Sequence, residues 1–248
     1  MNTLAVGVTP GGQPFFQGTH MDNNLELIIF DCDGVLVDSE IIGIRLTVSL
    51  LNQHGVAIGF DEFTRDYSGL AWSELIDKVR ADKGVNIAES IHQQFYSLLM
   101  AEFGNSLSRI AGTDEVISGI TTRKCICSNS GAEQLDYMLS LVGLKHLFAA
   151  NIFSAVDLGP GRAKPQPDIF LHAAEVMHAT PANTMVIEDS VHGVIAAKRA
   201  GMYVIGFTGG AHTNASHRGR LEAAGADTVI DSMYLLNAEI ARFRQRAE

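Results

Sequence analysis

The chain has 248 residues, a formal net charge of −10 and a pI near 5.3. Its apolar fraction of 46% and charged fraction of 19% are those of an ordinary globular protein. The acidic balance and the lack of any basic run argue against a nucleic-acid partner and against an anionic lipid surface. An anionic substrate would therefore need a few local cations or a metal.

The chain contains three cysteines, an odd and sparse set that favours reduced thiols over a disulfide framework. No apolar run reaches the length of a membrane span, so no membrane partner is expected. Residues 1–20 contain no Lys or Arg and do not resemble a secretory signal. We expect residues 1–24 to be a disordered extension, with Met21 as a candidate natural start, and we expect the protein to be cytoplasmic.

Short apolar runs alternate with amphipathic segments from residue 25 onward, a pattern typical of repeated βα units and a parallel sheet. The pattern predicts six strands, at Leu25–Phe30, Lys124–Cys127, Asn151–Ser154, Met185–Glu188, Tyr203–Phe207 and Thr228–Ile230. The expected fold is a Rossmann-like α/β core of three layers, with helices on both faces of the sheet.

One stretch, from Glu40 to Ser108, contains no convincing strand. It predicts helices around Ile41–Gln53, Ala71–Ala81 and Ala88–Phe103. We interpret residues 39–108 as a small helical cap domain, inserted into a core formed by residues 25–38 and 109–248. Because ligands bind at the carboxyl ends of the strands in open parallel sheets, an insertion after the first strand would lie over the site as a lid.

Polar residues follow several of the predicted strands, and the fold would bring them to one edge of the sheet. They are Asp31, Asp33, Ser128, Asn129, Lys164, Glu188 and Asp189. Four carboxylates in one cleft raise one another's pKa unless cations compensate them. Lys164 supplies one positive charge, and a divalent metal is the natural second. Oxygen ligands favour Mg²⁺, which typically uses one or two carboxylates together with substrate phosphate oxygens.

At this point the segments DCDGVLVDS, CSNS, AKPQPDIF and VIEDSVHG, in this order, resemble the four motifs of the haloacid dehalogenase-like (HAD) hydrolases. The resemblance covers essentially everything from Leu25 onward. Each motif alone is moderately specific, whereas the ordered set is strong. The helical insertion is similar to the cap of the subfamily that contains β-phosphoglucomutase and many small sugar-phosphate phosphatases.

The resemblance implies a role for each acid. Asp31 would be the nucleophile that forms an aspartyl-phosphate intermediate. Asp33 would be the general acid and base, a kind of help typically worth ~10²–10⁴-fold. Mg²⁺ would be held by the Asp31 carboxylate, the Asp33 carbonyl and Asp189, with Glu188 as an indirect ligand through water.

The resemblance also implies that Ser128 and Lys164 hold the transferring phosphoryl group, assisted by Asn129. In the cap, Gly69, Trp72 and Arg45 are candidate substrate-binding residues. Trp72 is equally compatible with a place in the cap core and with a place in the wall of the substrate pocket. Arg45 is compatible with a place at the cleft and also with a solvated helix face, which is the commoner place for an arginine.

The choice between a mutase and a phosphatase depends on the cap. β-Phosphoglucomutases have a basic residue just before the cap-loop glycine and an arginine three residues after it, where this chain has Ser68 and Trp72 around Gly69. The cap histidine expected near position 43 is Gly43. These differences favour hydrolysis of a monophosphate over handling of a bisphosphate.

The resulting hypothesis is a Mg²⁺-dependent phosphatase that acts on a small phosphorylated metabolite, a sugar phosphate or a sugar-acid phosphate. The alternatives are a phosphosugar mutase and a non-catalytic protein that binds a phosphorylated metabolite. The sequence does not identify the substrate or the oligomeric state, although a monomer is slightly favoured.

Overall fold

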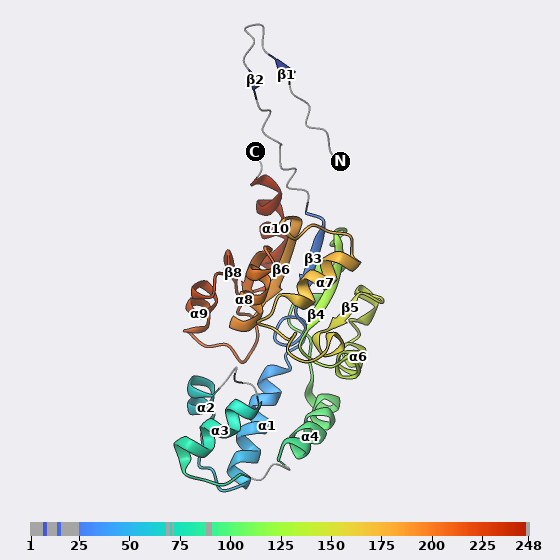
Figure 1. Ribbon diagram of the computed structural model, residues 1–248. Helices are drawn as coiled ribbons and strands as arrows, with labels where there is room; N and C mark the ends of the chain where they lie inside the picture. The colour runs from blue at the N-terminus through green and yellow to red at the C-terminus, as the bar shows by residue number, and fades with distance from the viewer. Residues whose placement is uncertain are drawn as a thin grey trace.

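A six-stranded parallel sheet forms the centre of the computed structural model, which describes residues 7–8, 14–15, 25–67, 70, 72–87 and 91–246 (Figure 1). The strand order is β5-β4-β3-β6-β7-β8, and every pair is parallel. The strands are β3 (Leu27–Phe30), β4 (Arg123–Ser128), β5 (Ile152–Ser154), β6 (Thr184–Glu188), β7 (Tyr203–Phe207) and β8 (Thr228–Ile230). All six predicted strands are present, so the predicted α/β fold class is confirmed.

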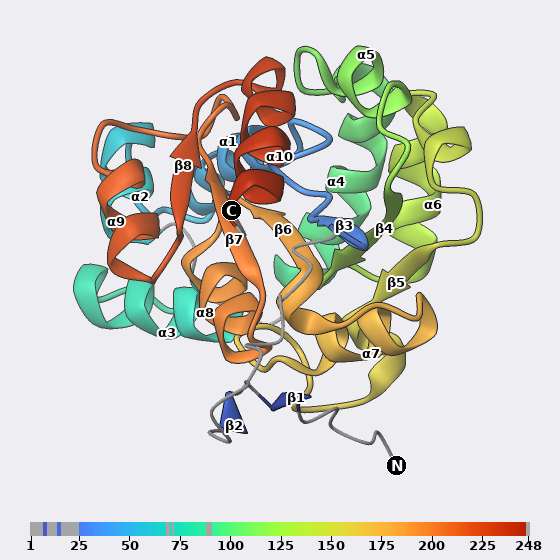
Figure 2. The same ribbon diagram turned by 90° about the horizontal axis from the view of Figure 1, so that it is seen from above.

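The sheet is the middle of three layers (Figure 2). Because successive strand residues point to opposite faces, the fully buried strand β3 contributes to two hydrophobic cores: Ile28 and Phe30 to one, Leu27 and Ile29 to the other. The first core is covered by α5 (Thr113–Ser118), α6 (Ala132–Leu141) and α10 (Leu236–Gln245). The second is covered by α7 (Asp168–Val176), α8 (Val191–Arg199) and α9 (His217–Ala223). Short 3₁₀ turns are η1 (Lys145–Leu147), η2 (Ala155–Leu158), η3 (Pro181–Asn183) and η4 (Met233–Leu235).

Four further helices lie together beyond the carboxyl ends of the strands (Figure 1). They are α1 (Glu40–Gln53), α2 (Phe60–Asp66), α3 (Trp72–Lys83) and α4 (Ile91–Ser106). We call them the helical unit. They share a hydrophobic core of their own, which includes Leu50, Leu51, Phe63 and Val79.

Helix α2 was not among the helices predicted from the sequence. With seven residues, FDEFTRD, it is too short to give a clear helical period, and Phe63 is the only apolar residue after its first position. The structure therefore adds one helix to the predicted three.

Two chain crossings connect the helical unit to the sheet. The backbone N–H of Asp38 donates to the carbonyl of Ser108 at 2.9 Å, and that of Ile110 donates to Leu36 at 3.0 Å. The outgoing and returning segments thus lie side by side and form a short hinge at one end of α1. In the described residues, no helix is both long enough and apolar enough to cross a membrane.

Two short strands, β1 (Gly7–Val8) and β2 (Pro14–Phe15), pair with each other in antiparallel fashion. The remainder of the segment 1–24, for which we expected disorder, lies outside the described residues. Gly69, a predicted substrate-binding residue, also lies outside them.

Candidate active site

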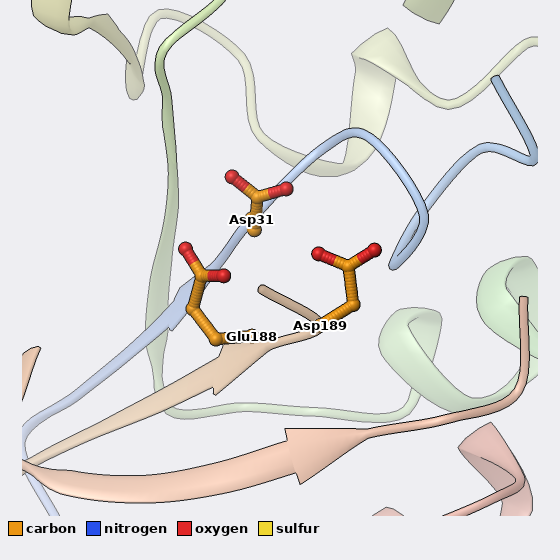
Figure 3. A group of neighbouring side chains, drawn as sticks. All are labelled: Asp31, Glu188 and Asp189. Atoms are coloured by element: carbon orange, nitrogen blue, oxygen red, sulfur yellow. The ribbon is translucent and has the colours of Figure 1, made fainter. Parts of the chain in front are cut away.

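Polar side chains from separate loops meet at the carboxyl edge of the sheet, in a cleft of about 820 Å³ between the sheet and the helical unit. Each site residue predicted for the core follows or ends a strand, as parallel topology requires, except Lys164, which comes from the loop before α7. Figure 3 shows the carboxyl groups of Asp31, Glu188 and Asp189 gathered beyond the ends of β3 and β6. The predicted core residues that line the cleft are Asp31, Asp33, Ser128, Asn129, Lys164 and Asp189.

Lys164 joins two of the acids. Its Nζ donates to Asp31 Oδ1 at 2.5 Å, to Glu188 Oε1 at 2.5 Å and to the Cys127 carbonyl at 2.8 Å. The side chains of Lys164, Asp31 and Glu188 are 3%, 9% and 0% exposed, so these contacts are almost completely shielded from water. Asn129 Oδ1 accepts a hydrogen bond from the Lys164 backbone N–H at 3.0 Å, which fixes the loop that carries the lysine.

Asp33 is held by three hydroxyl groups. Its carboxylate accepts from Ser39 Oγ at 2.6 Å, from Ser130 Oγ at 2.8 Å and from Ser128 Oγ at 3.3 Å. Ser39 immediately precedes α1, so this contact joins the acid to the hinge of the helical unit. Sequence reasoning assigned no role to Ser39 or Ser130, although both lie within segments that it singled out.

Asp189 is held by two histidines. His212 Nε2 lies 3.2 Å from Asp189 Oδ2, and His217 Nε2 lies 2.6 Å from the Asp189 backbone carbonyl. Both imidazoles are buried and belong to the segment after β7. No spacing in the sequence pointed to them, because the contact forms only through the packing of that segment against β6.

Two glycines leave room for the acids. A Cβ at Gly34 would lie 1.9 Å from Asp189 Oδ2, and the φ of +74° also favours glycine there. A Cβ at Gly193, in the first turn of α8, would lie 1.9 Å from the carboxyl carbon of Glu188. Glu188 also accepts from the N–H and the hydroxyl of Ser190, at 3.2 and 3.0 Å. The backbone therefore closes tightly around both carboxylates.

The charges of the cluster do not balance. Burial raises the pKa of Asp31 well above its usual range; Lys164 opposes this rise, and the neighbouring acids add to it. Burial and the charges of Glu188 and Asp33 likewise raise the pKa of Asp189. Burial alone would lower the pKa of Lys164, but Asp31 and Glu188 raise it above its usual value, so the lysine stays charged. The cluster thus contains one ammonium group, that of Lys164, and four carboxyl groups, those of Asp31, Asp33, Glu188 and Asp189.

A metal ion fits this imbalance. Asp31, Glu188 and Asp189 each offer an oxygen atom, and these atoms lie within 4.8 Å of one another. An all-oxygen donor set suits a hard divalent cation, and the surplus of buried negative charge favours one. The donors present therefore match the predicted kind of metal.

The helical unit forms the outer wall of the cleft. Glu40, Gly43, Ile44 and Thr47 line it from one face of α1, at helical spacing. Burial, followed by the charges of Asp189 and Asp33, raises the pKa of Glu40 to about 7, although part of its side chain is open to the cleft.

The two described cap residues among the predicted set have different positions. Trp72 lines the cleft and also stacks on Phe95, with ring centroids 4.7 Å apart, so it is both a wall residue and a core residue. Arg45 is not among the residues that line the cleft; it lines a separate cavity of about 450 Å³ beside Ser108. Arg45 comes five positions after Glu40, about 140° further round the helix, which places it on a different side of α1.

Comparison with known proteins identifies the family. The family model described as haloacid dehalogenase-like hydrolase matches residues 28–207. A 6-phosphogluconate phosphatase of Escherichia coli is 31% identical over 191 residues, which are 77% of this chain and 86% of that protein.

Solved structures agree. A conserved haloacid dehalogenase-like protein from Agrobacterium tumefaciens is 45% identical, with a TM-score of 0.85 over 88% of this chain and 99% of that chain. A HAD family hydrolase from Deinococcus radiodurans, solved with bound phosphate and sodium, is 27% identical, with a TM-score of 0.78 over 90% and 97%. The predicted family is confirmed: the chain belongs to the haloacid dehalogenase-like hydrolases and is an enzyme of their phosphatase kind.

Proposed function

We propose that the chain hydrolyses a small sugar phosphate or sugar-acid phosphate in a Mg²⁺-dependent reaction through a phosphorylated Asp31. The observation that carries this proposal is the buried contact of Lys164 with both Asp31 and Glu188, beside Asp189, at the lining of a substrate-sized cleft. Small-molecule sites in proteins typically have volumes of roughly 300–1,000 Å³.

Asp31 would hold the metal together with Asp189 and the main-chain carbonyl of Asp33, and Glu188 would act through water. When bound, Mg²⁺ would neutralise charge on the phosphate oxygens. The relative that was solved with bound phosphate and sodium supports the binding of an anion and a cation by this chain.

Asp31 suits the role of nucleophile because it lines the cleft and its carboxylate is oriented by Lys164. The ammonium opposes the effect of burial on the pKa of this carboxyl and so favours the ionised form, which is the form that can attack phosphorus. Attack would form an Asp31–phosphate bond and break the bond from phosphorus to the leaving oxygen.

Asp33 suits the acid and base. The three serine hydroxyls position its carboxyl at the lining of the same cleft as Asp31. Asp33 would give a proton to the leaving oxygen and later remove one from the water that cleaves the Asp31–phosphate bond. Because Ser39 is one of its partners, the position of Asp33 depends on the hinge of the helical unit.

Ser128, Asn129 and Lys164 would hold the phosphoryl oxygens. All three line the cleft, and before the substrate arrives each donates to a protein oxygen: Ser128 to Asp33, Asn129 to the Lys164 carbonyl, and Lys164 to Asp31 and the Cys127 carbonyl. Donors fixed in this way stabilise charge that develops in the transition state without further reorganisation. The segment 39–108, which contains the helical unit, would act as the cap domain that closes over the substrate.

A screen of phosphorylated metabolites with Mg²⁺ tests the proposal through the release of inorganic phosphate. We expect turnover of at least one sugar phosphate, lost on addition of EDTA and restored by excess Mg²⁺. The absence of Mg²⁺-dependent turnover on every ester, including p-nitrophenyl phosphate, would refute it. Faster isomerisation of a hexose phosphate than release of phosphate would instead establish a mutase.

A further inference from the structure

The side of the cleft that the helical unit forms is acidic and aromatic. Glu40 and Glu74 line it from α1 and α3, and Trp72 and Phe95, which stack on each other, line it as well. Thr47 and Gln134 add uncharged polar groups to the lining. This wall offers oxygen atoms that accept hydrogen bonds from hydroxyl groups and an aromatic face that packs against sugar carbons.

All 18 Lys and Arg residues of the chain fall within the described residues, so every strong cation can be placed. Among the described residues that line the cleft, Lys164 is the one Lys or Arg. Its ammonium already contacts two carboxylates and a carbonyl. The described lining therefore provides no free Lys or Arg for a second anionic group of a substrate.

The Lys and Arg side chains of the helical unit either pair with acids of that unit or line a cavity other than the cleft. The pairs on α2 and α3 are Arg65–Asp66 at 2.8 Å, Lys78–Asp82 at 2.7 Å, Arg80–Asp77 at 3.2 Å and Lys83–Glu62 at 2.5 Å. Arg45 lines the separate cavity near the hinge. The segments of the helical unit outside the described residues, 68–69, 71 and 88–90, contain no Lys or Arg in the sequence.

We infer that the cleft selects phosphomonoesters whose leaving group carries no second negative charge, that is, neutral polyhydroxyl or aminated sugar phosphates, and that it discriminates against sugar-acid phosphates and bisphosphates. This inference rests on the proposed function and narrows it. A carboxylate on the leaving group would lose water, find no free Lys or Arg in the described lining and share the cleft with Glu40. Neutral hydroxyl groups carry no such penalty.

The 6-phosphogluconate phosphatase relative acts on a sugar-acid phosphate, according to its name. The inference therefore separates this chain from a relative of 31% identity by substrate charge rather than by substrate size. A site discriminates in this way when binding of the rejected substrate brings like charges together or leaves a charged group without a partner.

Substrates of one carbon skeleton test the inference. They are sorbitol 6-phosphate, glucose 6-phosphate, glucosamine 6-phosphate and 6-phosphogluconate, with glycerol 3-phosphate and 3-phosphoglycerate as a smaller pair. The quantity measured is kcat/KM with Mg²⁺ at pH 8, where imidazoles are ordinarily uncharged. We expect the neutral or aminated ester of each set to exceed the acid by about tenfold or more, as a single close charge repulsion produces.

The outcomes are separate. If an acid is hydrolysed as well as, or better than, its neutral counterpart, the inference is overturned and the proposed function stands. If no ester, including p-nitrophenyl phosphate, is hydrolysed with Mg²⁺, both are overturned. If the six-carbon and three-carbon esters all react slowly, we compare their inhibition constants as competitors of p-nitrophenyl phosphate hydrolysis. The inference then requires each acid to inhibit more weakly than its neutral counterpart, and equal or stronger inhibition by the acids would overturn it.

Gly43 offers a gain-of-function test. It lies in the α1 face that lines the cleft, and a Cβ there meets no atom within 4 Å. Gly43→Lys adds a cation to the wall, whereas Gly43→Gln adds a side chain of similar length without charge; both are good helix formers. The ratio of kcat/KM for 6-phosphogluconate to that for sorbitol 6-phosphate should be about tenfold higher with lysine than with glutamine, and added salt should reduce the difference. Equal ratios in the two variants would overturn the inference.

Discussion

Lys164→Met should destabilise the protein strongly, and more at pH 8 than at pH 5. In the wild type the ammonium lies 2.5 Å from both Asp31 and Glu188, with all three side chains nearly inaccessible to water. Removing one partner of a buried ionic group typically costs about 3–5 kcal/mol, because the remaining charges are left uncompensated. For a chain of this size, about 2–4 °C per kcal/mol gives a fall in Tm of roughly 6–20 °C.

The pH dependence follows from the same contacts. Burial raises the pKa of Asp31, and Lys164 is the group that opposes the rise. Without Lys164, the folded-state pKa of this acid rises further above its unfolded-state value. The additional destabilisation of the variant is therefore fully present above its own folded-state pKa and disappears as the pH falls below the folded-state pKa of the wild type.

Urea denaturation followed by circular dichroism, in EDTA at pH 5 and pH 8, measures the effect. Lys198→Met is a matched control, because Lys198 pairs with Asp227 at 2.8 Å in a contact whose side chains are 36% and 23% exposed. Exposed pairs typically contribute about 0–1 kcal/mol. Equal losses for the two variants at both pH values would refute the assignment of Lys164 as the main counter-charge of the cluster.

Three further predictions concern the same cluster. Glu40→Gln should raise the free energy of unfolding in EDTA by about 1 kcal/mol at pH 8, after allowance for solvent screening. The gain should shrink as the pH falls to 4.5, because an acid whose folded-state pKa is about 7 destabilises the fold only when it is ionised. Urea titrations that show no difference between the variant and the wild type at both pH values would refute this. Gly193→Ala should cost about 1–3 kcal/mol by displacing Glu188, whereas Gly219→Ala in α9, with no atom within 4 Å of its Cβ, should not destabilise; equal Tm values would contradict this. Mg²⁺ at about 100 times its Kd should stabilise the wild type by about 2.7 kcal/mol, and thermal shifts with Asp189→Asn should show most of that gain lost; an unchanged shift would remove Asp189 from the metal site.

Much of the fold could be predicted because the strands of a parallel sheet are continuous apolar runs. The run Leu27–Phe30 is buried on both faces, so its sequence contains no alternation that could be misread. Helix α2 could not be predicted, since seven mostly polar residues do not reveal a period. Its position depends on contacts of Phe63 with the core of the helical unit.

The acids of the site could be predicted because parallel topology brings the residues after each strand to one edge. The groups that hold them could not. Ser39 reaches Asp33 because the hinge turns back at the start of α1, and His212 reaches Asp189 because a loop after β7 packs against β6. Arg45 shows the converse: its charge suggested a role, but the helical period places it outside the lining of the cleft.

The rate of phosphate release by Asp31→Asn tests the central claim most directly. With the best substrate of the screen and saturating Mg²⁺, we expect kcat to fall by several orders of magnitude in a protein that retains the circular dichroism spectrum of the wild type. Asp157→Asn, at an exposed position in η2, should keep the wild-type rate. Acid-quenched wild type should carry one phosphoryl group on the peptide that contains Asp31. Turnover by Asp31→Asn at a rate close to that of the wild type would contradict the account.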